Sequence, residues 1–91
     1  DRVRETLFNW LGQDVTGKIF LDLFAGSGAL SFEAVSRNAL RAILIEKNLQ
    51  AASDLIKNKK LLNCDNITVI NVDGLEYLKS CNCEFDVLLL D

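Results

Sequence analysis

Residues 19–30 read Ile19-Phe20-Leu21-Asp22-Leu23-Phe24-Ala25-Gly26-Ser27-Gly28-Ala29-Leu30 and carry the clearest structural pattern in the chain. Its first five residues have the length and apolar composition of a strand that is buried on both faces. Gly26 and Gly28 allow a positive φ and let a ligand approach the main chain where a side chain would clash. We expect Ser27 to cap the helix that follows, whose N-terminal amides would face a ligand above the turn. The stretch therefore predicts a strand, a ligand-binding turn and a helix.

Two ligand classes fit such a turn, because it occurs in dinucleotide-binding proteins and in methyltransferases that use S-adenosylmethionine. Ser31 stands where the dinucleotide fingerprint G-x-G-x-x-G has its third glycine, so that match is partial. Asp22, expected at the strand tip, would repel a pyrophosphate by roughly 3–4 kcal/mol at ~4–5 Å and an effective dielectric constant of about 20. The same carboxylate suits the cationic amino group and sulfonium of S-adenosylmethionine. Asp22 therefore favours S-adenosylmethionine over a nicotinamide cofactor, the alternative being that it only caps the turn.

The rest of the chain alternates between apolar runs, which predict strands, and amphipathic segments, which predict helices. Strands are expected at 18–23, 41–45, 66–72 and 85–90, and helices at 1–11, 29–37, 48–62 and just after Asp73. Asn38 is expected to adopt the left-handed conformation that ends the second helix. The third helix is expected to bury Leu49, Ala52, Leu55, Ile56 and Leu62. This alternation predicts an α/β fold in which helices flank a parallel sheet, with the strand order three, two, one, four.

Acidic residues stand at or just after the ends of the four expected strands. They are Asp22, Glu46, Asp73 and Asp91. Because ligands bind in the crevice at the C-terminal ends of parallel strands, we expect these carboxylates to converge there. Glu46 is suited to accept hydrogen bonds from both hydroxyls of a ribose, which S-adenosylmethionine and NAD share. Asp73 is suited either to cap the short helix that follows or to accept a hydrogen bond from an adenine amine.

Composition narrows the class of protein. The 91 residues are 49% hydrophobic and carry a net charge of −3, which indicates one small domain with a core and no general affinity for nucleic acid. No segment has the length of a membrane span or the pattern of a signal peptide. The three cysteines lack a zinc spacing and the chain has no histidine, so we expect no metal site and the reduced thiols of a cytoplasmic protein.

Three segments resemble the bacterial RsmD-type methyltransferases, which modify the guanine N2 amine in small-subunit ribosomal RNA. They are residues 1–11, residues 21–30 and residues 32–37, the last ending in Ser36-Arg37. The resemblance covers essentially the whole chain. It implies a Rossmann-like class I methyltransferase fold and methyl transfer from S-adenosylmethionine to one guanine of 16S rRNA. The implied partner is 16S rRNA or an assembly intermediate of the small ribosomal subunit, with no membrane and no metal.

The resemblance also implies roles for individual residues. Those that would contact S-adenosylmethionine are Asp22, Ala25, Gly26 and Gly28 at its methionine end, Glu46 at its ribose, and Asp73 with Gly74 at its adenine. Asp91 matches the first residue of the family's Asp-Pro-Pro-Phe motif. Its side chain and carbonyl would accept hydrogen bonds from the guanine N2 amine, so that catalysis would be largely positioning.

The chain ends before the rest of that motif. We therefore expect residues 1–91 to be the S-adenosylmethionine-binding part of a single methyltransferase domain, truncated after the fourth strand and inactive alone. Two alternatives stay open on the residues themselves. One is the cofactor domain of an NAD-dependent oxidoreductase, and the other is a non-catalytic module that binds an adenosine cofactor.

Overall fold

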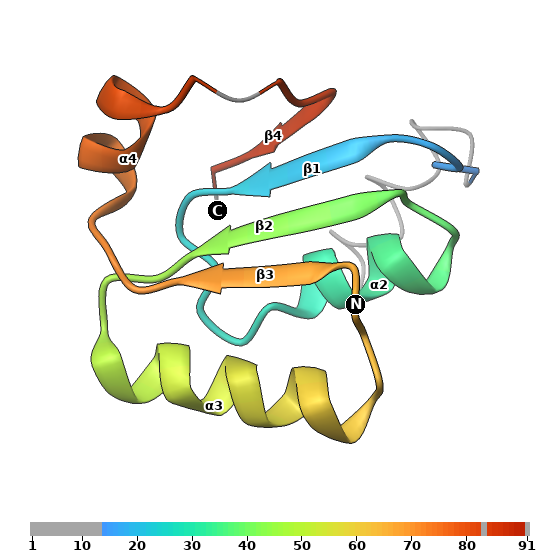
Figure 1. Ribbon diagram of the computed structural model, residues 1–91, viewed down its shortest axis with the longest axis horizontal. Helices are drawn as coiled ribbons and strands as arrows, with labels where there is room; N and C mark the ends of the chain where they lie inside the picture. Colours follow the sequence, from blue (N-terminus) through green and yellow to red (C-terminus); the bar gives the residue numbers. More distant parts are fainter. Residues whose placement is uncertain (1–13, 83, 91) are drawn as a thin grey trace.

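The computed structural model describes residues 14–82 and 84–90. Strands and helices alternate along the described chain, as Figure 1 shows. In chain order the elements are β1 (Ile19–Asp22), α2 (Ala29–Ser36), β2 (Arg41–Ile45), α3 (Leu49–Leu61), β3 (Ile67–Ile70), α4 (Gly74–Ser80) and β4 (Val87–Leu89). The expected helix at 1–11 lies outside the described residues, as do Cys83 and Asp91.

The four strands form one parallel sheet in the order β3-β2-β1-β4, which confirms the predicted α/β class and strand order. Within the sheet, Leu21 of β1 pairs with Ile43 of β2 on one side and with Leu88 of β4 on the other. All four strands therefore end at the same edge of the sheet, at the left in Figure 1. That edge is where the sequence predicts the ligand crevice.

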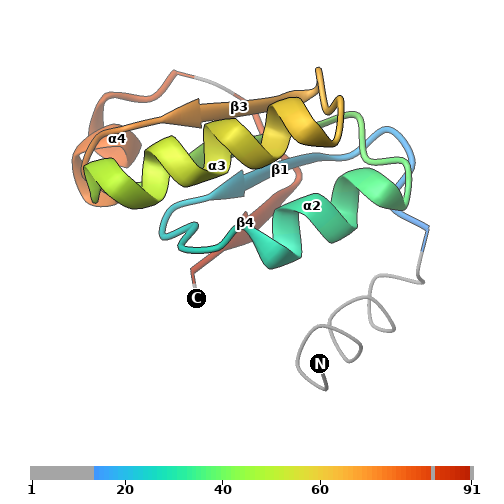
Figure 2. The same ribbon diagram turned by 90° about the horizontal axis from the view of Figure 1, so that it is seen from below.

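The core has two parts, one on each face of the sheet. Helices α2 and α3 cover one face (Figure 2), where Phe20, Leu44 and Ile67 are buried together with Leu55 of α3. On the other face, Leu21, Leu23 and Ile45 are buried beneath partly exposed side chains that include Tyr77 of α4. Alternate residues of each strand point to opposite faces, so the continuous apolar runs fill both layers.

The observed helix boundaries agree closely with those predicted from the sequence, but one predicted cap is wrong. Asn48 precedes α3 and its Oδ1 accepts a hydrogen bond from the amide of Ala51 at 2.8 Å, and Asn38 has the expected positive φ of 74°. Ser27 does not cap α2, contrary to expectation, because the N-cap is Gly28 with φ 76° and no side-chain hydrogen bond. The glycine turn thus continues one residue further before the helix begins.

The buried stripe of α3 is narrower than the sequence predicts. Ala52 and Leu55 are buried, but Leu49 is 73% exposed, Leu62 is 62% exposed and Ile56 is 40% exposed. Helix α3 lies along β3 at the margin of the sheet (Figure 1), so only one line of side chains reaches the core. An apolar pattern gives the direction of a helix face but not the width that its neighbours cover.

Two further observations concern membrane-spanning segments and the cysteines. Among the described residues, no helix has the length and apolarity that a membrane crossing requires. Cys64 is a free thiol, whereas Cys81 is disulfide-bonded, which corrects the expectation of reduced thiols for Cys81.

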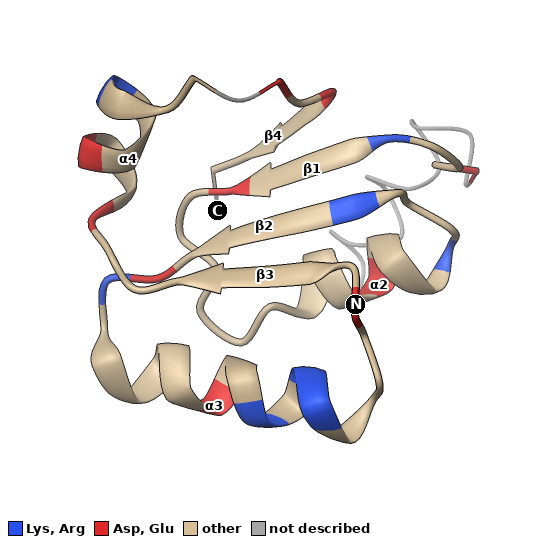
Figure 3. Cartoon of the chain, viewed as in Figure 1, with Lys and Arg blue, Asp and Glu red and all other residues tan. Residues whose placement is uncertain are grey.

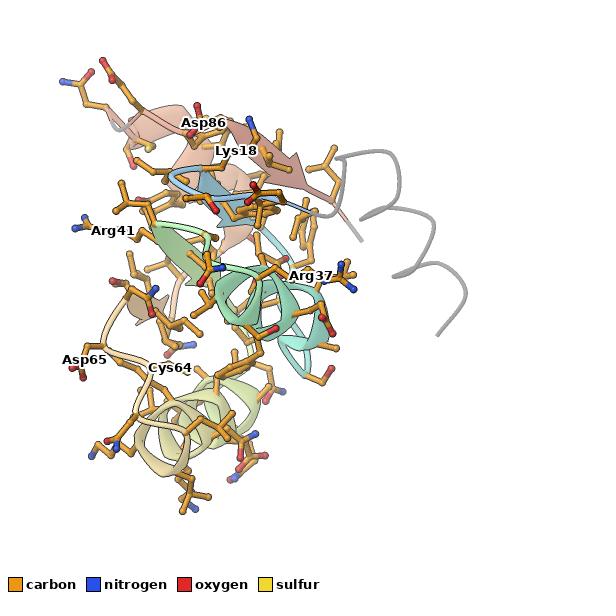
Figure 4. All side chains as sticks on the ribbon, turned by 90° about the vertical axis from the view of Figure 1, so that its right-hand side faces the viewer. Lys18, Arg37, Arg41, Cys64, Asp65 and Asp86 are labelled. Carbon is orange, nitrogen blue, oxygen red and sulfur yellow. The ribbon has the colours of Figure 1, made fainter. Side chains whose placement is uncertain are left out.

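Asp86 joins the start of β4 to the start of β1. Its amide donates to the carbonyl of Ile19 at 2.8 Å, and its Oδ2 accepts from the amide of Ile19 at 2.7 Å. The side chain thus supplies an acceptor that continues the parallel ladder. Figure 4 looks onto the end of the sheet where the strands begin and labels Asp86 there with Lys18 and Arg41.

We expect Asp86→Ala to lower the free energy of unfolding by about 1–2 kcal/mol, because the amide of Ile19 loses a charged acceptor. Asp86→Asn keeps an acceptor oxygen and should lose clearly less. Urea unfolding of the two variants beside Asp65→Ala, an exposed position at the same end of the sheet, provides the comparison. Equal stability of Asp86→Ala and the unsubstituted protein would show that this hydrogen bond does not hold β4.

Candidate functional site

Acidic positions gather at the C-terminal edge of the sheet. Figure 3 shows them at the arrowhead of β1, directly after β2 and directly before α4. The residues are Asp22, Glu46 and Asp73. The fourth acid of the predicted set, Asp91, lies outside the described residues. For the three that are described, the parallel sheet brings to one edge carboxylates that are far apart in sequence.

Asp22 ends β1 and is only 4% exposed. Its Oδ2 accepts a hydrogen bond from the hydroxyl of Ser31 at 2.9 Å, and Ser31 is fully buried in the first turn of α2. A cavity of about 70 Å³ lies beside them and is lined by Asp22, Phe24, Ala25, Ser27, Ala29 and Leu30. The carboxylate therefore lies between the glycine turn and the start of α2, where the helix dipole favours a negative charge.

Glycine is favoured at the two positions of the turn for different physical reasons. Gly28, with φ +76°, packs against α3: a Cβ there would lie 2.7 Å from Leu55 Cδ2 and 3.0 Å from Phe32 Cε2. Gly26, with φ +56°, has open space where a Cβ would be. Gly28 is therefore favoured by its backbone conformation, and the neighbouring side chains leave little room for a Cβ. Gly26 is the glycine over which a ligand has room to approach the main chain.

Glu46 connects the glycine turn to the start of α3. Its Oε1 accepts from the amide of Gly26 at 2.8 Å, and its Oε2 accepts from the amide of Asn48 at 2.9 Å. The amide of Ala25 also donates to the carbonyl of Ile45 at 3.2 Å. Each carboxylate oxygen can accept a second hydrogen bond, so Glu46 keeps capacity for hydroxyl donors. The structure thus brings Glu46 and Gly26, which are twenty residues apart, into direct contact.

Asn71 belongs to this edge and was missed by the sequence reasoning. Its Nδ2 donates to the carbonyl of Glu46 at 2.8 Å and to the carbonyl of Lys47 at 2.9 Å. The amide of Glu46 donates in turn to the carbonyl of Ile70 at 3.0 Å. Asn71 therefore holds the main chain from which the Glu46 side chain extends. The signal in the sequence was a carboxamide directly after a strand, at the same edge as the acids.

Asp73 caps α4, which confirms one of its two predicted roles. Its Oδ1 accepts from the amides of Leu75 and Glu76 at 3.0 and 3.1 Å. Its Oδ2 lies 4.0 Å from Nζ of Lys47, an exposed pair that contributes little to stability. Contact with an adenine stays a prediction for Asp73.

Gly74 is buried against the main chain of Leu23, the residue directly after β1. A Cβ at this position would overlap the carbonyl oxygen of Leu23 and would lie 3.3 Å from Leu23 Cβ. Packing alone therefore explains why position 74 is a glycine. The contact of Gly74 with adenine stays a prediction. Within residues 14–82 and 84–90, no group of three His, Cys, Asp or Glu side chains could hold a metal ion.

Known proteins resemble this chain along its whole length. The family model described as "Conserved hypothetical protein 95" matches residues 1–91. Ribosomal RNA small subunit methyltransferase D of Escherichia coli is 43% identical over 91 residues, which is 100% of this chain and 46% of that protein. The chain thus spans about half the length of the curated relatives it matches.

Solved structures share the fold. The structure of the Escherichia coli protein yhhF has a TM-score of 0.95 at 43% identity and covers 100% of this chain and 51% of that one. The structure of P. horikoshii TYW2 in complex with MeSAdo has a TM-score of 0.59 at 29% identity and covers 63% of this chain and 22% of that one. These likenesses confirm the predicted Rossmann-like, class I methyltransferase architecture.

We expect Asn71→Asp to destabilise the protein by about 2 kcal/mol and Asn71→Ala by about 1 kcal/mol. Alanine removes two donated hydrogen bonds, whereas aspartate also places a carboxylate against two carbonyl oxygens. Thermal unfolding at neutral pH measures both, with Asn58→Ala on α3 as the matched control. If Asn71→Asp proved as stable as the unsubstituted protein, the bonds to Glu46 and Lys47 would carry no weight.

Proposed function

The chain belongs to the family described as "Conserved hypothetical protein 95", the RsmD family, and on this premise we propose that the whole protein is a methyltransferase of small-subunit ribosomal RNA. The donor is S-adenosylmethionine, and the acceptor is the exocyclic N2 amine of a guanine in 16S rRNA. The partner is that RNA or an assembly intermediate of the small subunit, which implies action in the cytoplasm.

The observation that carries the proposal is the contact between Glu46 and the glycine turn. An acid at the tip of β2 accepts from the Gly26 amide at 2.8 Å, beside open space above that glycine. A ribose lying over Gly26 would present its hydroxyls to the same carboxylate. A structural neighbour solved with MeSAdo supports an S-adenosyl ligand for this fold.

The carboxylates also suit the charge of the donor. Asp22 is buried beside the small cavity of the turn, where the ammonium group of the methionine end would meet it. A pyrophosphate in the same place would be repelled by that carboxylate. Ala25, Gly26 and Gly28 would line the methionine end, and Asp73 with Gly74 would lie near the adenine. This charge argument is what separates the proposal from an NAD-dependent oxidoreductase.

The reaction is an in-line displacement. S-adenosylmethionine, when bound, would supply an electrophilic methyl carbon to the lone pair of the guanine N2 nitrogen, with S-adenosylhomocysteine as the leaving group and one amine proton released to solvent. Asp91 would accept a hydrogen bond from that amine through its carboxylate and its carbonyl. Its contribution is to orient the nitrogen, as expected for catalysis by positioning.

Residues 1–91 alone should lack this activity. The last described strand, β4, is at the edge of the sheet, and its neighbourhood exposes Leu88 at 36% and Leu90 at 62%. An apolar edge strand pairs with another chain or aggregates when it is left open. Methylation of 16S rRNA by the isolated 91-residue chain would contradict this expectation.

The cofactor is tested by calorimetric titration of the protein with S-adenosylhomocysteine and, separately, with NAD. We expect binding of S-adenosylhomocysteine only. Glu46→Gln should weaken that binding about tenfold, since the amide replaces an acceptor oxygen with a donor. Asp65→Asn, at the opposite end of the sheet, is the matched control and should not change the affinity. Binding of NAD alone would favour the oxidoreductase instead.

The catalytic step is tested with the Asp91→Ala variant of the whole protein. Turnover on 16S rRNA should fall by about 100-fold or more, because the nitrogen is no longer held in line with the methyl carbon. Affinity for S-adenosylhomocysteine should stay within about twofold, since Asp91 is assigned no contact to the cofactor. A variant with undiminished turnover would show that Asp91 is not catalytic. A protein that binds the cofactor but methylates no RNA would be the non-catalytic module.

A further inference from the structure

We propose that Ser31 is a positioning residue that fixes the Asp22 carboxylate toward the amino-acid end of the S-adenosyl ligand. This inference rests on the proposed function and adds Ser31, which the site described above does not include among the ligand-binding residues. The Ser31 hydroxyl donates to Asp22 Oδ2 at 2.9 Å. Ser31 is 0% exposed and Asp22 is 4% exposed, so the bond lies away from solvent.

Burial makes this hydrogen bond consequential. A carboxylate removed from water loses its hydration and needs fixed donors in return. A helical serine can instead donate to a carbonyl one turn earlier, yet Ser31 donates across to the end of β1. Because α2 and β1 are both regular elements, the hydroxyl holds one carboxylate oxygen at a defined place. Sites on rigid elements attain the precision that ligand recognition requires.

The location of Asp22 makes the effect specific to one end of the ligand. The cavity beside it has a volume of about 70 Å³ and is lined by Asp22 and by residues of the glycine turn, so a cationic group of the ligand that enters it would meet the carboxylate. The acceptor proposed for the ribose is Glu46, which contacts the turn at Gly26. Asp22 and Glu46 thus serve different parts of one ligand. Ser31 contacts Asp22, so its influence should be confined to the amino-acid end.

The position of Ser31 in the sequence relates this hydrogen bond to the choice between the two ligand classes. Ser31 stands at the third glycine position of the dinucleotide fingerprint. A glycine there would have no hydroxyl to donate. The departure from the fingerprint therefore supplies the donor for the carboxylate that disfavours a pyrophosphate.

The test compares two ligands that differ at the amino-acid end. S-adenosylhomocysteine carries that end, and 5′-methylthioadenosine lacks it. In calorimetric titration, Ser31→Ala should weaken S-adenosylhomocysteine about fivefold and 5′-methylthioadenosine by less than about twofold. In an Asp22→Asn background, which removes the carboxylate charge, the selective loss should disappear.

Two further variants keep the test decisive. Ser36→Ala removes a hydroxyl that donates to the Glu33 carbonyl at 2.7 Å in the same helix, and it should change neither affinity. If Ser31→Ala fails to fold, as judged by circular dichroism, Ser31→Cys keeps nearly the same volume with a weaker donor. The cysteine variant should then show a smaller loss that is again selective for S-adenosylhomocysteine.

The outcomes separate this inference from the proposed function. An equal loss for both ligands, or no loss for either, would overturn the role of Ser31 and leave the cofactor assignment intact. A selective loss that persists unchanged with Asp22→Asn would show that Ser31 does not act through Asp22. Binding of neither ligand by the unsubstituted protein would overturn the proposed function and this inference with it.

Discussion

Strand β1 pairs in parallel with both β2 and β4, and this pairing sets the positions of the turns and helices that form the candidate site. Strands that run in the same direction end at the same edge, so the residues that follow them meet there whatever their distance in sequence. Helices α2 and α3 serve as crossovers and cover one face of the sheet (Figure 2). Every element of the candidate site is a strand tip, the turn after it or the start of the next helix.

Carboxylates that gather at one edge repel one another unless donors compensate their charge. Here each described acid has such donors: the Ser31 hydroxyl for Asp22, two main-chain amides for Glu46, and the first amides of α4 for Asp73. These hydrogen bonds replace part of the hydration that each carboxylate loses at the edge. A cluster of carboxylates at one edge favours cationic ligands over phosphates, which is the charge argument behind the proposed sulfonium donor.

Three glycines illustrate why one residue type need not mean one role. Gly74 is confined by the main-chain carbonyl of Leu23 and is required by packing. Gly28 has a positive φ of 76°, and the side chains of Leu55 and Phe32 also leave little room there. Gly26 has open space above it and donates its amide to Glu46. The sequence analysis assigned all three glycines to the ligand. A glycine in a sequence does not show whether protein atoms or a ligand occupy the space where a side chain would be.

From the sequence alone, the element types, the parallel strand order, the acids at the strand ends, the left-handed Asn38 and the cap at Asp73 could be predicted. These rest on local pattern and on rules for connecting neighbouring elements, which a single chain displays. The hydrogen bond from Ser31 to Asp22 and the hold of Asn71 on the main chain of Glu46 became visible only in the folded chain. The same holds for the cap of α2, which is Gly28 rather than Ser27, and for the narrow buried stripe of α3. Contacts between distant residues depend on the exact separation and rotation of packed elements, and hydrophobic periodicity does not contain that information.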